Sequence, residues 1–179
     1  MSHTLSTPKG TLAVRPAVQE DAFWLRELRL EALTNQPQSF TADFTIAAAE
    51  PVESWAERVA NFETDQQGVI CVAAAEKRLI GMLGLIRGNR PKTQHTGTVW
   101  GVYVQADWRG LHVAEAMVRE AIAWAQARGL VRLKLEVITT NAAAIRSYVR
   151  CGFTVYGVEP EVIFYDDIYY DELLMTRPV

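Results

Sequence analysis

The stretch VWGVYVQADWRGLHVAEAMVREAIAWAQARGLVRLKLEVITTNAAAIRSYVRCGF, residues 99–153, decides the fold. It reads in order as a strand, a tight turn, an amphipathic helix, a second strand and a short helix. The turn, residues 109–114, leads directly into the first helix. Because the first N–H groups of a helix lack partners and lie at the positive end of its dipole, this turn suits an anion. The stretch therefore predicts a site that holds a diphosphate.

The segment after the turn predicts a helix and then a strand with one buried face. The helix is expected over residues 113–128, where apolar side chains recur at helical spacing, and Gly129 suits its C-terminal end. Glu115 and Arg119 stand four residues apart, so they are expected to form an outward-facing ion pair. In LKLEV, residues 133–137, apolar and charged side chains alternate. These elements predict a right-handed βαβ crossover whose helix covers one face of a sheet.

The rest of the chain predicts a single domain over residues 11–179, preceded by a flexible polar tail over residues 1–10. Helices are expected to open at Pro16 and Pro51, because proline suits the first turn of a helix. Further strands are expected at residues 11–15, 68–75, 79–87, 96–104, 153–158 and 168–176. This order indicates a mixed α/β fold in which an antiparallel meander leads into the crossover.

Composition and charge narrow the class of protein. A length of 179 residues and a mass of 20.0 kDa suit one domain with a sizeable core. The net charge of −3 provides no basic stripe, so nucleic acid is not expected as the main partner. Cys71 and Cys151 lack the spacing of a metal or redox site and indicate reduced thiols. No signal peptide or membrane-spanning run is found, so a cytoplasmic protein is expected. The cysteine spacing leads us to expect no bound metal.

A second motif stands at a fixed interval after the turn. It is N-x-x-A-x-x-x-Y-x-x-x-G-F, residues 141–153. The two motifs together resemble those of the GNAT superfamily of acyl-CoA-dependent N-acetyltransferases, and the resemblance covers almost the whole chain. It implies a central mixed, mostly antiparallel, twisted sheet with helices on both faces. The sheet is expected to splay apart between the strands at residues 96–104 and 132–138.

His112 departs from the family pattern, which usually has glycine at this place in the turn. Glycine there would let the backbone approach a diphosphate closely. His112 is therefore expected to take an ordinary helical conformation and to point its ring outward.

The resemblance implies acetyl-CoA as cosubstrate, lying in the opening between the splayed strands. Its diphosphate is expected on the turn, and its pantetheine arm beside the main chain of the strand ending at Val104. The implied contacts are Val102, Tyr103, Val104, Arg109, Gly110, Leu111, His112, Val113, Ala114, Asn141, Ala144 and Ser147. Two of them have alternative interpretations, because Arg109 can be a solvated surface side chain and Asn141 a plain helix cap.

Tyr148 stands where the family usually has its general acid, and its hydroxyl is protonated at neutral pH. The alternative is a core tyrosine that anchors the short helix. A backbone N–H of the strand 102–104 can stabilise an oxyanion. The sequence identifies no general base: Glu136 is expected to be a solvated strand residue, and His95 a surface residue.

The acceptor is expected to be an amine of a small molecule or peptide. An aromatic and acidic pocket is the hypothesis for its site, formed by Phe40, Phe44, Tyr165 and Asp166. Two alternatives stay open: a non-catalytic acyl-CoA-binding module, and an acetyltransferase that modifies a macromolecule. A homodimer is also compatible with the resemblance, since dimers are common in the superfamily.

Overall fold

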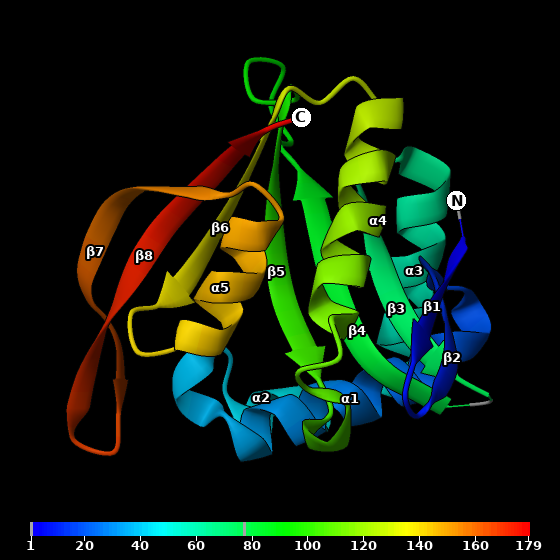
Figure 1. Ribbon diagram of the computed structural model, residues 1–179, viewed down its shortest axis with the longest axis horizontal. Helices are drawn as coiled ribbons and strands as arrows, with labels where there is room; N and C mark the ends of the chain where they lie inside the picture. The colour runs from blue at the N-terminus through cyan, green and yellow to red at the C-terminus, as the bar shows by residue number, and fades with distance from the viewer. Residues whose placement is uncertain (1, 77) are drawn as a thin grey trace.

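A single eight-stranded sheet forms the centre of the structure, a computed structural model that describes residues 2–76 and 78–179 (Figure 1). Its strands are β1 (His3–Thr7), β2 (Gly10–Pro16), β3 (Gly68–Ala75), β4 (Arg78–Arg87), β5 (Thr96–Val104), β6 (Arg132–Ile138), β7 (Thr154–Tyr165) and β8 (Ile168–Pro178). They lie in the order β1-β2-β3-β4-β5-β6-β8-β7. Only β5 and β6 run parallel, while the other neighbours are antiparallel. The predicted mixed, mostly antiparallel sheet is confirmed.

Helices cover both faces of this sheet, as predicted (Figure 1). They are α1 (Ala22–Asn35), α2 (Phe44–Ala49), α3 (Val52–Asp65), α4 (Val113–Ala127) and α5 (Ala142–Arg150), with short 3₁₀ turns η1 (Gln19–Asp21), η2 (Pro37–Ser39) and η3 (Ala106–Trp108). One core lies under α4 and α5 and includes Met117 and Phe153. The other lies under α1 and α3 and includes Leu25 and Trp55. None of the helices in the described ranges is long and apolar enough to cross a membrane.

The N-terminal segment forms the edge of the sheet, so the prediction of a flexible tail over residues 1–10 is wrong. His3–Thr7 pairs antiparallel with β2. The reversal is tight, with Gly10 at a φ of 117°, and the Thr7 hydroxyl donates to the Gly10 carbonyl at 2.7 Å. At the start of the strand, His3 Nδ1 lies 3.1 Å from a carboxylate oxygen of Glu120 on α4. The contact with Glu120 is long-range in sequence, so polar composition alone gave no sign of it.

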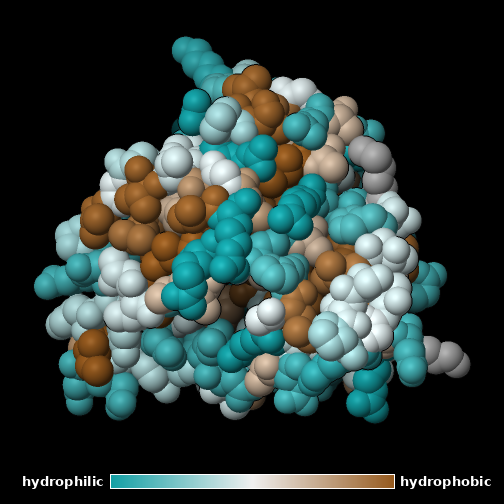
Figure 2. Space-filling model, in the orientation of Figure 1, coloured by the Kyte–Doolittle hydropathy of each residue, from teal (hydrophilic) through white to brown (hydrophobic). Residues whose placement is uncertain are grey.

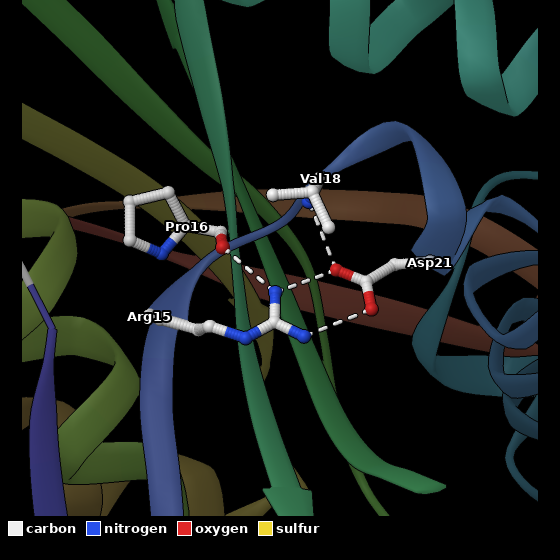
Figure 3. A network of polar contacts seen from close by, with 4 residues as sticks. All are labelled: Arg15, Pro16, Val18 and Asp21. Carbon is white, nitrogen blue, oxygen red and sulfur yellow. Dashed lines mark hydrogen bonds and ion pairs between the residues drawn. The ribbon is translucent and has the colours of Figure 1, made fainter. Parts of the chain in front are cut away.

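An ion pair stabilises the junction between β2 and α1. The prediction that Pro16 opens the helix is wrong. Pro16 ends β2, and α1 begins only at Ala22, after η1. The guanidinium of Arg15 donates two hydrogen bonds to the Asp21 carboxylate, at 2.6 and 2.9 Å (Figure 3). The Val18 N–H donates to the same carboxylate at 2.9 Å. Asp21 is only 7% exposed, and its contacts with Arg15 and Val18 link the end of β2 to the residue before α1.

The sheet splays between β5 and β6, as the sequence predicts. Their parallel register covers only residues 96–98 against residues 132–134. Along β5 the pairing with β4 also shifts, because Met82 pairs with Tyr103 while Gly84 pairs with Trp100. One extra residue therefore lies in β5, and Gly101 takes a φ of 61° there. This bulge turns the end of β5 away from regular pairing.

The C-terminal hairpin is longer than the sequence predicts. β7 continues to Tyr165 and β8 to Pro178, whereas strands are expected only at residues 153–158 and 168–176. Asp166 and Asp167 form the turn, with φ of 52° and 58°. Two successive left-handed residues make the tight turn that suits the twist of a hairpin. The end of β7 next to this turn lies close to η2, so the hairpin meets the segment that follows α1.

Candidate active site

A cavity of about 490 Å³ opens where β5 and β6 separate. In the space-filling view, a hollow near the centre of this face lies between hydrophilic and hydrophobic side chains (Figure 2). Tyr148 and every expected cofactor contact except Leu111 line the cavity. Leu111 instead packs against the core under α4. The fold thus brings together the two motifs that stand about thirty residues apart in the sequence.

The turn before α4 reverses through two left-handed residues. Gly110 has a φ of 76°, and His112, the N-cap residue of α4, has a φ of 60° and a ψ of 19°. The prediction of an ordinary helical conformation for His112 is therefore wrong. Histidine is among the non-glycine residues that occupy this region more often, at a cost of about 1 kcal/mol. The ring does point outward, since its side chain is 62% exposed.

Glu115 is buried at the start of α4, so the expected outward pair with Arg119 is wrong. Its residue is 3% exposed. One carboxylate oxygen lies 3.2 Å from His112 Nδ1, and it accepts a hydrogen bond from Arg150 at 3.2 Å. Burial disfavours the charged form, but hydrogen bonds from its own backbone N–H, from Arg150 and from His112 outweigh burial and lower the pKa of Glu115. A carboxylate is also favoured at a helix N-terminus.

Three arginines line the cavity, and two of them were missed by the sequence analysis. Arg109 is exposed, but its Nε donates to the Val104 carbonyl at 3.0 Å, so it is anchored rather than free in solvent. Arg146 and Arg150 lie on α5 and are also exposed. Their four-residue spacing, which places both on one side of the helix, was the available signal. Together the three guanidinium groups make this end of the cavity positively charged.

Asn141 caps α5, and the cap leaves its amide nitrogen available. Its Oδ1 accepts a hydrogen bond from the Ala144 N–H at 3.1 Å. The two N–H donors of the side chain remain for another partner. Because Asn141 also lines the cavity, the plain-cap interpretation and a ligand contact are both compatible with this geometry.

Tyr148 is 6% exposed, and its ring packs 6.1 Å from that of Phe153. Its hydroxyl has no hydrogen-bond partner within residues 2–76 and 78–179. Burial, and secondarily the nearby Cys151, raises the pKa of Tyr148 far above its ordinary value. The phenol therefore keeps its proton at neutral pH and presents it beside the cavity.

Glu136 also lines the cavity, although its place in the alternating pattern predicts only a solvated strand residue. It is exposed, and it lies on the sheet face opposite to its buried neighbours Leu135 and Val137. Glu172 on β8 is 7% exposed, and burial, then Glu136 and Glu159, raise its pKa. The negative charge of Glu136 on β6 is therefore close enough to affect the pKa of Glu172 on β8.

A second cavity, of about 580 Å³, lies between the η2–α2 segment and β7. It gathers three of the four expected acceptor residues, Phe40, Phe44 and Tyr165. Asp166 does not line it and forms the hairpin turn instead. Phe40 lines both cavities, so the two spaces adjoin. The helix α2 was missed because its single apolar turn gives no clean period.

The splayed sheet with a helix N-terminus at its gap agrees with the class of acyl-CoA-dependent N-acetyltransferases. The model of the acetyltransferase (GNAT) family matches residues 30–153, and the chain belongs to this family. It is therefore an acyltransferase with acetyl-CoA as its acetyl donor.

Comparisons with individual proteins agree with this assignment. The chain is 29% identical to L-amino acid N-acetyltransferase AaaT of Escherichia coli (strain K12) over 127 residues, which are 69% of this chain and 74% of that protein. A GNAT-family acetyltransferase structure from Streptococcus pneumoniae has a TM-score of 0.84 at 23% identity, covering 94% of this chain and 99% of that chain. The structure of yncA from Salmonella typhimurium with its cofactor acetyl-CoA has a TM-score of 0.79 at 20% identity, over 93% of both chains. At these identities the structural likeness shows the shared fold.

Proposed function

We propose that this protein transfers the acetyl group of acetyl-CoA directly to a primary amine of a small molecule or peptide, with Tyr148 as the general acid. The placement of Tyr148 carries the proposal, because its buried phenol shares one cavity with the N-terminus of α4 and the bulged end of β5. The name of the E. coli relative, an L-amino acid N-acetyltransferase, supports an acceptor of amino-acid size.

The residues at the positive end of the cavity fit the phosphates of acetyl-CoA, which supplies an activated acyl thioester when bound. Val113 and Ala114 lie in the first turn of α4, where backbone N–H groups have no intrahelical partner. A side chain built at Gly110 would meet no atom within 4 Å, so a ligand can approach the turn closely. Arg109 and Arg146 add positive charge beside it.

The free edge of β5 suits the amide groups of the pantetheine arm. Strand pairing with β6 ends at Thr98, so the main chain from Val102 to Val104 has no strand neighbour on this side. An extended amide chain can take the place of that missing strand. Asn141 supplies N–H donors from the opposite wall, since its oxygen is already used by the helix cap.

Three groups of this chain then serve the chemistry. A backbone N–H of the bulged end of β5 stabilises the negative charge that develops on a carbonyl oxygen in acyl transfer. Tyr148 holds a proton on its hydroxyl for a departing thiolate. Glu136 accepts the proton of the amine, because Glu115, the other carboxylate among the lining residues, is already hydrogen-bonded to His112 and Arg150.

We further propose that the protein works in the cytoplasm. The two free cysteines are both buried, and burial raises the pKa of each thiol, which suits a protein that stays reduced.

Thiol release from acetyl-CoA in the presence of a panel of primary amines tests the proposal. We expect amine-dependent release with one acetylated product per thiol, and Tyr148→Phe should slow it. The competing hypothesis is a non-catalytic acyl-CoA-binding module. It predicts tight binding of acetyl-CoA with no amine-dependent release across the panel, and no effect of Tyr148→Phe.

A further inference from the structure

We infer that the cavity between the η2–α2 segment and β7 holds a large apolar side chain of the acceptor, so that the preferred acceptors are amines carrying such a group. This inference rests on the proposed function and names the substrate class for the same site. The lining residues determine which kind of side chain the cavity can hold. The cavity also shares a wall with the one between β5 and β6 that contains Tyr148, called the reaction cavity below, and this position links its occupant to the acceptor.

The lining of this cavity is mainly apolar. Its apolar side chains come from two segments far apart in the sequence, namely Leu33, Pro37, Phe40 and Phe44 on one side and Val162, Ile163, Phe164 and Tyr165 on the other. Aromatic rings provide large contact areas for an apolar ligand. The cavity is therefore suited to an aromatic or branched aliphatic group.

Two of these rings are exposed in the free protein, which leaves apolar surface in contact with water. Phe44 is 45% exposed, and Tyr165, which shares a face of β7 with the buried Ile163, is also 45% exposed. Removing such surface from water is favourable in proportion to the apolar area covered. An apolar side chain that enters the cavity would cover these rings and gain affinity from doing so.

Two polar side chains in the lining already have partners. The Thr34 hydroxyl donates to the Leu30 carbonyl at 2.9 Å, and Asp43 caps α2 by accepting from the Ile46 N–H at 3.1 Å. A site that specifies a polar side chain needs unpaired donors or acceptors directed into it. The Thr34 hydroxyl therefore offers no donor to a ligand, and the cap uses one oxygen of Asp43, so the preference comes from the apolar side chains that make up most of the lining.

The position of the cavity identifies its occupant as part of the acceptor. Phe40 lines both this cavity and the reaction cavity, and the segment before it borders both, through Gln36 on one side and Pro37 on the other. The guanidinium of Arg29 lies 4.9 Å from the centre of the Phe40 ring and supports it from α1. A group attached close to the reacting amine can therefore extend past Phe40 into the apolar space.

Matched acceptors and one filling variant test this inference on the full chain. The acceptors are glycinamide, L-serinamide, L-leucinamide and L-phenylalaninamide, compared by kcat/KM from thiol release. The variant is Ala42→Trp, because Ala42 is exposed and lines only the apolar cavity. The control is Ile46→Trp, on the same segment but 75% exposed and outside both linings. Thermal unfolding of both variants verifies that they fold.

We expect L-phenylalaninamide and L-leucinamide to exceed glycinamide in kcat/KM by about tenfold or more, the scale on which hydrophobic pockets discriminate. Ala42→Trp should remove most of that preference, measured as the ratio of kcat/KM for L-phenylalaninamide to kcat/KM for glycinamide, and Ile46→Trp should leave this ratio unchanged. Equal kcat/KM for all four amides, or a preference that survives Ala42→Trp, overturns the inference while leaving the acetyltransferase function intact.

A binding measurement separates this inference from the proposed function. Calorimetric titration with N-acetyl-L-phenylalaninamide in the presence of CoA needs no turnover. If no amine is acetylated but this compound binds and Ala42→Trp weakens it, the proposed reaction fails and the apolar site stands. If neither turnover nor binding occurs, both proposals are wrong.

Discussion

The imidazole Nδ1 of His112 lies 3.2 Å from the carboxylate Oε1 of Glu115, across the first turn of α4. His112 makes this contact from a left-handed backbone conformation. Glycine, which the resemblance to the family leads us to expect at this position, adopts that conformation freely. The contact with Glu115 offsets part of the cost of having a side chain there, and Arg150 holds the other side of the same oxygen.

His112→Gly should keep its affinity for CoA and be more stable than His112→Ala by about 1 kcal/mol, since only glycine avoids the left-handed penalty. Calorimetric CoA titration and thermal unfolding of the two variants provide the comparison. If the glycine variant lost affinity for CoA while the alanine variant kept it, the left-handed backbone conformation would not explain why position 112 accepts either glycine or histidine.

Tyr148→Phe should lower kcat by about 10- to 100-fold, because general acid catalysis is worth about 10²–10⁴ and a thiol of pKa about 8.5 already leaves readily. The phenylalanine ring can keep the packing against Phe153, so stability and CoA affinity should change little. Steady-state rates with the best acceptor, beside calorimetric CoA titration, measure both effects. Unchanged kcat would assign Tyr148 to the core alone.

Asn141→Ser and Asn141→Ala should separate the two roles of this residue. Serine retains a helix cap, whereas alanine loses it and should destabilise the fold by about 1 kcal/mol. Both lack the amide N–H donors that face the cavity, so both should raise the KM for acetyl-CoA. Chemical unfolding and initial rates give the two readouts. If Asn141→Ser has the KM of the unaltered protein, Asn141 is a cap only.

Glu172→Gln should raise the melting temperature at pH 7. Burial, Glu136 and Glu159 raise the pKa of Glu172 in the folded protein, so its ionisation opposes folding. The folded protein binds the carboxyl proton of Glu172 more tightly than the unfolded chain does. The stability that this proton contributes is present at acid pH and is lost as pH rises through the pKa of Glu172 in the folded protein. The variant's advantage should therefore disappear toward pH 4, where the ordinary carboxyl pKa of about 4.3 lies. An advantage that persists at acid pH would point to packing instead.

Asp21→Asn should destabilise the protein by about 2 kcal/mol, less than for a fully buried ion pair, because the Arg15 side chain is 29% exposed. The substitution leaves the Arg15 guanidinium without its two charged hydrogen bonds at the junction of β2 and α1 (Figure 3). Denaturant unfolding measures the change, and the exposed neighbour Glu20→Gln is the matched control. Equal stability of the two variants would contradict a structural role for the pair.

Local patterns were sufficient for much of the fold. The unbroken apolar run Gly68–Ala75 predicts β3 with the bounds that the structure has, because a strand covered on both faces needs no polar alternation. The turn and the motif at residues 141–153 are also local, and they place the helix start, the cap and the tyrosine. Strand β1, helix α2 and the outer part of the C-terminal hairpin were missed or shortened because neighbouring segments, rather than their own periodicity, hold them.

The sequence by itself determined the family, the two motifs and eleven of the twelve expected cofactor contacts as residues that the structure places along one cavity. Those features depend on residues close together in the chain, where backbone geometry dictates the outcome. Only the tertiary structure decided that Glu115 is buried between His112 and Arg150, that Glu136 reaches the cavity, and that the segment around Phe40 meets β7 in an apolar space. These relationships join segments distant in sequence, so they depend on how the sheet splays and where its hairpin folds back.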